Sequence, residues 1–72
     1  MVILTQSRDK IINFDKMDYI GVYNVYDVYA FKYDRPLCKI GGFETAKRAK
    51  DIIYDIYTSA KADCAYYYTP EK

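Results

Sequence analysis

The chain has 72 residues, a mass of 8.5 kDa and a formal net charge of +1, from 11 basic and 10 acidic residues. This length allows one domain, spanning residues 1–72, with little folding free energy to spare for strained catalytic geometry. The charge balance excludes the basic excess of a strong, nonspecific nucleic-acid binder. Because histidine is absent, the usual general base at neutral pH and the commonest metal ligand are missing. We therefore expect a protein that is not an enzyme and that holds no cofactor and no metal.

Short apolar runs in the first half of the chain predict a sheet. The expected strands are residues 2–5, 10–14, 19–23, 26–33 and 37–40. The clearest of them is 26–33, where an alternating pattern rich in aromatic and β-branched residues is typical of a half-buried strand. In this pattern Tyr29, Phe31 and Tyr33 share one face. Polar breaks at 6–9, near Asn24 and at 34–36 separate the strands.

The most regular pattern predicts one amphipathic helix over residues 46–61. Apolar residues recur there at i, i+3, i+4 and i+7, and Thr45 is a natural N-cap. Residues 65–69 are extended and aromatic, and Pro70 ends them, which is typical of an edge strand. This order predicts an α+β fold: a small antiparallel sheet of four to five strands, with the helix packed on one face.

Three stretches, Ile3–Asn13, Lys39–Ile56 and Tyr66–Glu71, carry a family resemblance. The chain resembles small uncharacterised proteins of Gram-positive bacteria and their phages. Those proteins open with a Trp-Ile-x-Ser-Gln-Asp-Lys-like strand, start their helix with Leu-Gly-x-Tyr-x-Thr-x-x-Arg-Ala and end near Tyr-x-Met-Pro-Glu. This chain departs from that pattern with Val2 for the Trp, an extra Gly42 and Thr69 for the Met. The resemblance implies an origin in a mobile element or its host and transfers no catalytic residue.

The cellular location follows from what the sequence does not contain. No apolar run approaches the length that spans a bilayer, and the N-terminus lacks the pattern of a signal peptide. We therefore expect a location in the bacterial cytoplasm and no membrane partner. In that compartment Cys38 and Cys64 are expected to be reduced and buried, with a disulfide as the alternative in an oxidising one.

Tyrosine is the unusual feature, because ten Tyr and three Phe stand against no Trp. One short helix cannot cover so many rings, so we expect some of them to form a recognition surface for a protein partner or for bases. The candidates are Tyr23, Tyr29, Phe31 and Tyr33, with Tyr19 as a neighbour. Packing within the fold is the alternative role for several rings. Tyr66, Tyr67 and Tyr68 must point alternately and cannot share a face.

A second candidate site lies in the first turns of the predicted helix. Lys47, Arg48 and Lys50 follow a glycine turn there, and helix N-termini attract anions such as phosphate. The alternative is a solvated basic face, partly neutralised by Glu44 and by Asp51, four residues after Lys47.

These patterns together predict a non-catalytic binding protein that acts by surface contact. The favoured interpretation is a phage- or prophage-type accessory protein that binds, and for example inhibits, a host defence or regulatory complex. One alternative is a nucleic-acid or nucleotide-binding module that uses the basic start of the helix. The other is a structural homo-oligomer whose aromatic faces pair across a two-fold axis.

Overall fold

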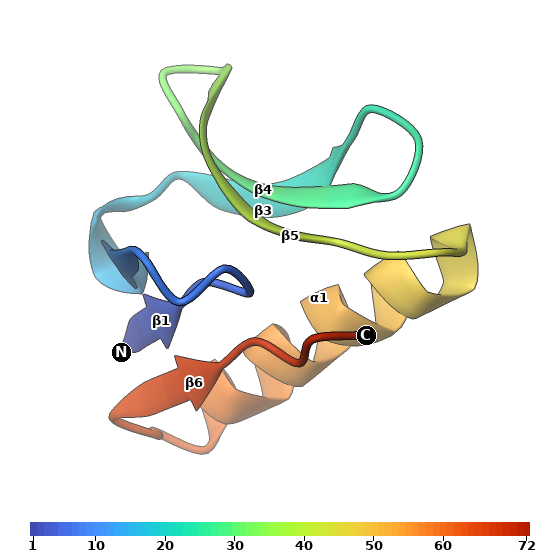
Figure 1. Ribbon diagram of the computed structural model, residues 1–72. Helices are drawn as coiled ribbons and strands as arrows, with labels where there is room; N and C mark the ends of the chain where they lie inside the picture. The colour runs from blue at the N-terminus through green and yellow to red at the C-terminus, as the bar shows by residue number, and fades with distance from the viewer.

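Six strands and one long helix make up the computed structural model, which describes residues 1–72 (Figure 1). The elements in chain order are β1 (Val2–Leu4), β2 (Ile11–Asn13), the 3-10 turn η1 (Phe14–Lys16), β3 (Tyr19–Tyr23), β4 (Asp27–Lys32), β5 (Arg35–Gly42), α1 (Ala46–Lys61) and β6 (Tyr66–Tyr68). The α+β class and the single helix agree with the prediction. No helix of the protein combines the length and the hydropathy needed to cross a membrane.

The strands form two three-stranded sheets instead of the single sheet that we expected. One sheet has the order β2-β1-β6 and the other β3-β4-β5. β6 pairs with β1 in parallel, whereas every other pair is antiparallel. The predicted number of strands and their arrangement are therefore wrong. The expectation of a C-terminal edge strand is confirmed by β6, which lies at the edge of the first sheet.

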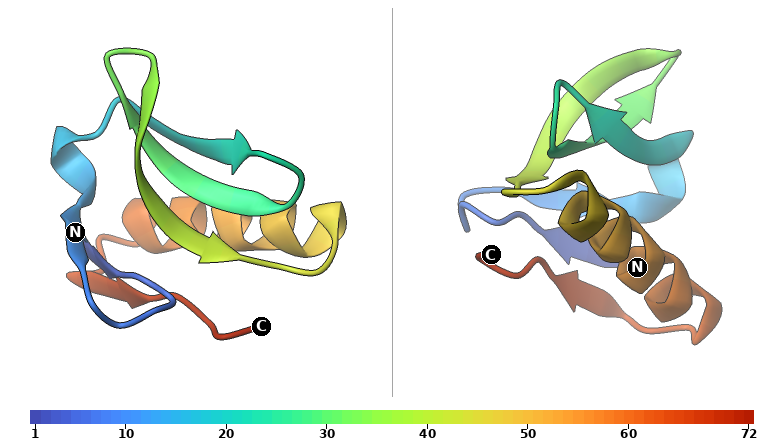
Figure 2. Two further views of the ribbon diagram at one scale, coloured as in Figure 1. Left: turned by 45° about the horizontal axis from the view of Figure 1, so that its top comes forward. Right: turned by 90° about the vertical axis from the view of Figure 1, so that its right-hand side faces the viewer.

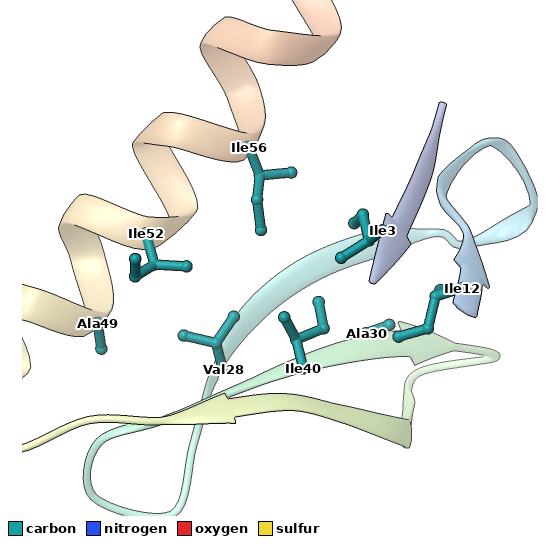
Figure 3. Close-up of a cluster of buried hydrophobic side chains, with 8 residues drawn as sticks. All are labelled: Ile3, Ile12, Val28, Ala30, Ile40, Ala49, Ile52 and Ile56. Carbon is teal, nitrogen blue, oxygen red and sulfur yellow. The ribbon is translucent and has the colours of Figure 1, made fainter. Parts of the chain in front are cut away.

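The core lies where α1 meets both sheets. The curved β3-β4-β5 sheet covers one side of α1, and β1 and β6 lie beside another part of the helix (Figure 1 and Figure 2). Figure 3 shows the helix side chains pointing toward residues of both sheets. The eight core residues are Ile3, Ile12, Val28, Ala30, Ile40, Ala49, Ile52 and Ile56. One apolar cluster thus holds the two sheets and the helix together.

Helix α1 has the predicted bounds and the predicted N-cap. The Thr45 hydroxyl accepts a hydrogen bond from the backbone N–H of Arg48 at 3.0 Å, which satisfies one free donor of the first turn. After the helix, Asp63 takes a left-handed φ of 62°, and the N–H groups of Asp63 and Cys64 bond back to Ala60 and Ser59. This is a Schellman ending with Asp63 in the place that glycine usually takes.

The side chain of Gln6 joins β5 and the C-terminal residues. Its amide oxygen accepts from the Gly42 N–H at 2.9 Å, and its amide nitrogen donates to the Gly42 carbonyl at 3.0 Å. The same nitrogen lies 3.2 Å from the carbonyl of Pro70 and 2.8 Å from that of Glu71. A Cβ on Gly41 would lie 3.1 Å from the Gln6 Cβ, so a side chain at this position would have to push Gln6 aside, and the close approach favours glycine.

Two further local expectations need correction. The break predicted at 34–36 is shorter, because β5 already begins at Arg35; Pro36 is tolerated since β5 is an edge strand. Both cysteines are free, but only Cys38 packs against the core, and Cys64 is exposed. Cys64 follows the turn that ends α1 and is open to solvent there.

Candidate functional site

Four rings gather on the side of the β3-β4 pair that faces away from α1. Along β4, Val28 and Ala30 enter the core, so the alternation of the strand turns Tyr29 and Phe31 to the opposite face. The register places Phe31 beside Tyr19 and Tyr29 beside Gly21. We call Tyr19, Tyr23, Tyr29 and Phe31 the aromatic face. The sequence predicted three of these residues as partner contacts and Tyr19 as their neighbour.

The rings of the aromatic face contact one another. The Tyr19 ring stacks on Phe31 with centroids 4.7 Å apart and planes at 15°. Tyr23 meets Tyr29 edge to face at 5.2 Å and Phe31 at 6.1 Å. Both geometries are favourable for aromatic pairs and hold the rings in fixed orientations. The surface is therefore a connected cluster instead of separate side chains.

Burial divides the cluster into a support and a contact surface. Phe31 is only 8% exposed because its neighbours cover it, whereas Tyr19 and Tyr23 keep 45% and 43% of their surface in solvent. The Phe31 ring lies over Gly21, where an added Cβ would stand 3.5 Å from Phe31 Cε1, an ordinary contact distance. Phe31 thus supports the tyrosines, and the tyrosines are the groups that another molecule could touch.

The charge beside these rings is balanced. Lys39 lies opposite Tyr29 on β5, and its ammonium group is 3.6 Å from the carboxylate of Asp27. Both groups stand next to Gly42, where a Cβ would come within 3.4 Å of each of them. The rim of the aromatic face therefore carries an ion pair and no net charge from these two residues.

Tyr33 does not share the strand face with Tyr29 and Phe31, which corrects the prediction. β4 ends at Lys32, and Tyr33 and Asp34 form the two-residue turn to β5 with φ values of 55° and 60°. Two positive φ angles in a two-residue hairpin define a type I′ turn, and its twist matches that of the strands. The Tyr33 side chain is 80% exposed, at a hairpin end that extends beyond the body in every view (Figure 1 and Figure 2).

Three contacts hold this turn in place. The Asp18 carboxylate accepts a hydrogen bond from the Tyr33 N–H at 2.8 Å, and the Tyr19 hydroxyl donates to Asp34 at 2.7 Å. The bond to Asp34 raises the pKa of Tyr19, because ionisation would remove the donated proton. The Lys32 ammonium group lies 5.3 Å from the centre of the Tyr33 ring, within cation–π range. Tyr19 therefore links the aromatic face to the turn.

The predicted anion site at the start of α1 is not assembled as a cluster. Lys47 pairs with Asp51 at 3.4 Å. The Arg48 guanidinium donates two hydrogen bonds, of 3.0 and 2.7 Å, to the backbone carbonyl of Lys72. Lys50 is exposed and, two residues further along the helix, points to another side. Sequence reasoning missed the role of Arg48, because its acceptor lies 24 residues away.

A second apolar surface lies on the exposed side of the other sheet, and the sequence did not predict it. A hollow of about 290 Å³ there is lined by Val2, Leu4, Ile11, Tyr66 and Tyr68. The two tyrosine rings stack at 4.9 Å, and Tyr67 between them turns toward the core, as the alternation predicted. No sequence pattern indicated this surface, because it forms only when β6 pairs with β1, which lies at the other end of the chain.

A second hollow separates β3 from the C-terminal half of α1. It measures about 190 Å³, and eight of its nine lining residues are hydrophobic. They are Phe14, Met17, Tyr19, Ile20, Ile53, Ile56, Tyr57 and Ala60, together with Asp18. No group of three or more Cys, Asp or Glu side chains in the protein is placed to hold a metal ion.

No family model, no curated protein and no solved structure matches this chain. The resemblance to proteins of Gram-positive bacteria and their phages stays a prediction from the quoted motifs.

Proposed function

We propose that this chain is a non-catalytic binding protein that contacts a protein partner through its aromatic face. The observation that carries the proposal is the connected cluster of Tyr19, Tyr23, Tyr29 and Phe31 on the sheet face that α1 leaves uncovered. Tyrosine rings provide large contact area at a low cost in conformational entropy, which is why they dominate recognition surfaces.

Preorganisation supports the proposal. Phe31 is buried under the tyrosines, so their stacking and edge contacts exist before any partner arrives. Side chains that are already ordered lose less entropy when they bind. The contact surface therefore resembles the packed centre of a protein interface, where aromatic anchors contribute most of the affinity.

The charge pattern favours a protein over a nucleic acid as the partner. A nucleic-acid site places unpaired cations beside its stacking rings, because phosphate contacts supply most of the affinity. Here the lysine opposite Tyr29 is paired with Asp27, and Arg48 at the start of α1 is engaged by the Lys72 carbonyl. A neutral aromatic surface suits the apolar centre of a protein interface.

Tyr33 belongs to the same proposal as a separate contact. It stands at the exposed end of the β4–β5 hairpin, and Tyr19 connects that end to the aromatic face. A partner that covers Tyr19 and Tyr23 could also meet the Tyr33 ring. The proposed setting is a bacterial cytoplasm, with a phage- or prophage-type role such as inhibition of a host complex; it rests on the motif resemblance alone.

A capture experiment tests the aromatic face. The wild-type chain and the Tyr23→Ala/Tyr29→Ala variant would be immobilised and exposed to lysate of a Gram-positive host, with quantitative mass spectrometry of the bound proteins. One anchor residue typically contributes about 2 kcal/mol or more, which is roughly thirtyfold in affinity, so we expect the loss of both rings to lower recovery of a specific partner by at least that factor. Circular dichroism would show that the variant keeps its fold.

The matched control is Tyr66→Ala/Tyr68→Ala, which removes a stacked, exposed tyrosine pair from the other sheet. This control should retain the partner at the wild-type level. Equal recovery by the wild-type chain and the Tyr23/Tyr29 variant would overturn the proposal. Loss with the control alone would also overturn it, by assigning the contact to the other sheet.

A further inference from the structure

The four free sheet edges of the protein differ in how they are protected. Natural edge strands avoid pairing with other chains by being short or by carrying charge, proline or bulges. β5 carries Arg35, Pro36 and Lys39, and its register with β4 shifts twice. β2 and β6 are only three residues long, and Pro70 follows β6 closely.

β3 is the exception, because it has none of these protective features. Its five residues, Tyr19–Tyr23, contain no charge and no proline, and they pair with β4 in an unbroken register. The outer edge of β3 has no partner, since the order of its sheet is β3-β4-β5. An uncharged, regular edge of this kind is a template for another strand.

The sequence of β3 identifies which strand fits. Tyr-Ile-Gly-Val-Tyr is nearly the same in both directions, with Gly21 at its centre. We propose that β3 pairs antiparallel with β3 of a second copy, across a two-fold axis at Gly21. Tyr19 then stands opposite Tyr23 of the second copy, and Ile20 opposite its Val22. Aromatic and β-branched cross-strand pairs of this kind stabilise sheets, and a two-fold axis needs such a self-complementary surface.

The flanking residues and the hollow beside β3 are compatible with this pairing. Continuing the register brings Asp18 toward Asn24 of the second copy, so no like charges meet there. On the inner side of the edge lies the apolar hollow of about 190 Å³ between β3 and α1. Val22 is 40% exposed in the single chain. The pairing would place Val22 of one copy beside Ile20 of the second copy, at the edge of that copy's hollow. Apolar surface on both copies would thus leave water.

The pairing would extend the candidate site. The β3-β4-β5 sheets of the two copies would become one six-stranded sheet. The aromatic face of each copy would then continue into that of the other through Tyr19 and Tyr23. Each copy then contributes rings to one surface. The edge pairing is independent of the proposed partner, because its test requires the purified chain alone.

Sedimentation at a series of concentrations tests the pairing. We expect the mass to rise from 8.5 kDa toward twice that value as the wild-type concentration increases. Val22→Lys introduces the charge that natural edge strands carry, and we expect it to weaken dimerisation by about tenfold or more. Val25→Lys is the control, because Val25 is 70% exposed in the turn that follows β3. This control should dimerise like the wild type.

A disulfide trap tests the register. Gly21→Cys, in a Cys38→Ala/Cys64→Ala background, places two thiols directly opposite each other on the two-fold axis, within the range of a disulfide. We expect rapid dimer formation on mild oxidation, and much slower formation when the single cysteine is introduced at Val25. A wild-type chain that stays monomeric at millimolar concentration would overturn the inference, and so would dimers that Val22→Lys leaves unchanged. Failure here leaves the capture experiment unaffected, so the two proposals can fail separately.

Discussion

Tyr67 shows how one residue in a run of three tyrosines acquires a different chemistry. Tyr66 and Tyr68 are exposed, whereas Tyr67 packs against the core and its hydroxyl is enclosed without a hydrogen-bond partner. Burial, followed by the negative charge of Asp55, raises the pKa of Tyr67 to about 12. The neutral phenol is therefore favoured in the folded chain.

This pKa predicts a loss of stability at high pH. Above about pH 10 the unfolded chain releases the Tyr67 proton while the folded chain retains it, so the free energy of unfolding falls as the pH rises toward 12. We expect urea midpoints measured between pH 8 and pH 11.5 to fall more steeply for the wild type than for Tyr67→Phe. Tyr66→Phe, which removes an exposed hydroxyl from the same strand, is the control and should follow the wild type. Parallel curves for the wild type and Tyr67→Phe would contradict the prediction.

At the scale of the element, the β4–β5 hairpin keeps a strained turn. Tyr33 and Asp34 both have left-handed φ angles, which are unfavourable for residues with a Cβ and favour Asn-Gly in this turn type. The contacts from Asp18 and Tyr19 hold the turn in this conformation. Strained backbone that is held by surrounding contacts clusters at functional sites. The strained turn is therefore consistent with the proposed role of the exposed Tyr33 ring as a partner contact.

We therefore expect Tyr33→Asn/Asp34→Gly to raise the free energy of unfolding by about 1 kcal/mol, because it relieves both left-handed residues. Chemical denaturation measures this change. The same variant should also capture less of the partner proposed for the aromatic face, since the Tyr33 ring is gone. A destabilised variant would show that the lost hydrogen bond between Tyr19 and Asp34 outweighs the relief of strain.

Helix α1 and this hairpin also show what local sequence can predict. The bounds of α1 followed from the apolar period and the Thr45 cap, which act within a few residues. The position of Tyr33 did not follow from local sequence. The period-two pattern continues past Lys32, and only the φ angles reveal the turn. Three of the four predicted partner-contact residues therefore lie together, and the fourth lies at the hairpin end.

At the scale of the whole molecule, Gln6 connects three segments. Its amide bonds to Gly42 in both directions and to the carbonyls of Pro70 and Glu71, so it joins the end of β1 to β5 and to the C-terminal residues. We expect Gln6→Ala to lower the free energy of unfolding by about 1–3 kcal/mol, because partly buried backbone groups lose their partners.

Gln6→Glu should lower the free energy of unfolding at least as much as Gln6→Ala, because a carboxylate would face three carbonyl oxygens in place of the donating amide. The control is Glu71→Ala, which keeps the backbone carbonyl that Gln6 contacts and should leave the denaturation midpoint unchanged. Wild-type stability of the Gln6→Ala variant would show that the segments are held by the apolar core alone.

The sequence by itself determined the helix, its cap, the approximate strands and the excess of tyrosine over what one helix can cover, because periodicity and capping are local properties. Only the tertiary structure decided that Val2 pairs with Tyr66, that the strands divide into two sheets and that Arg48 contacts Lys72. The same holds for the aromatic face, whose rings from β3 and β4 become one cluster through strand register. Such contacts depend on which distant segments bury apolar surface against each other, and no short window of sequence contains that information.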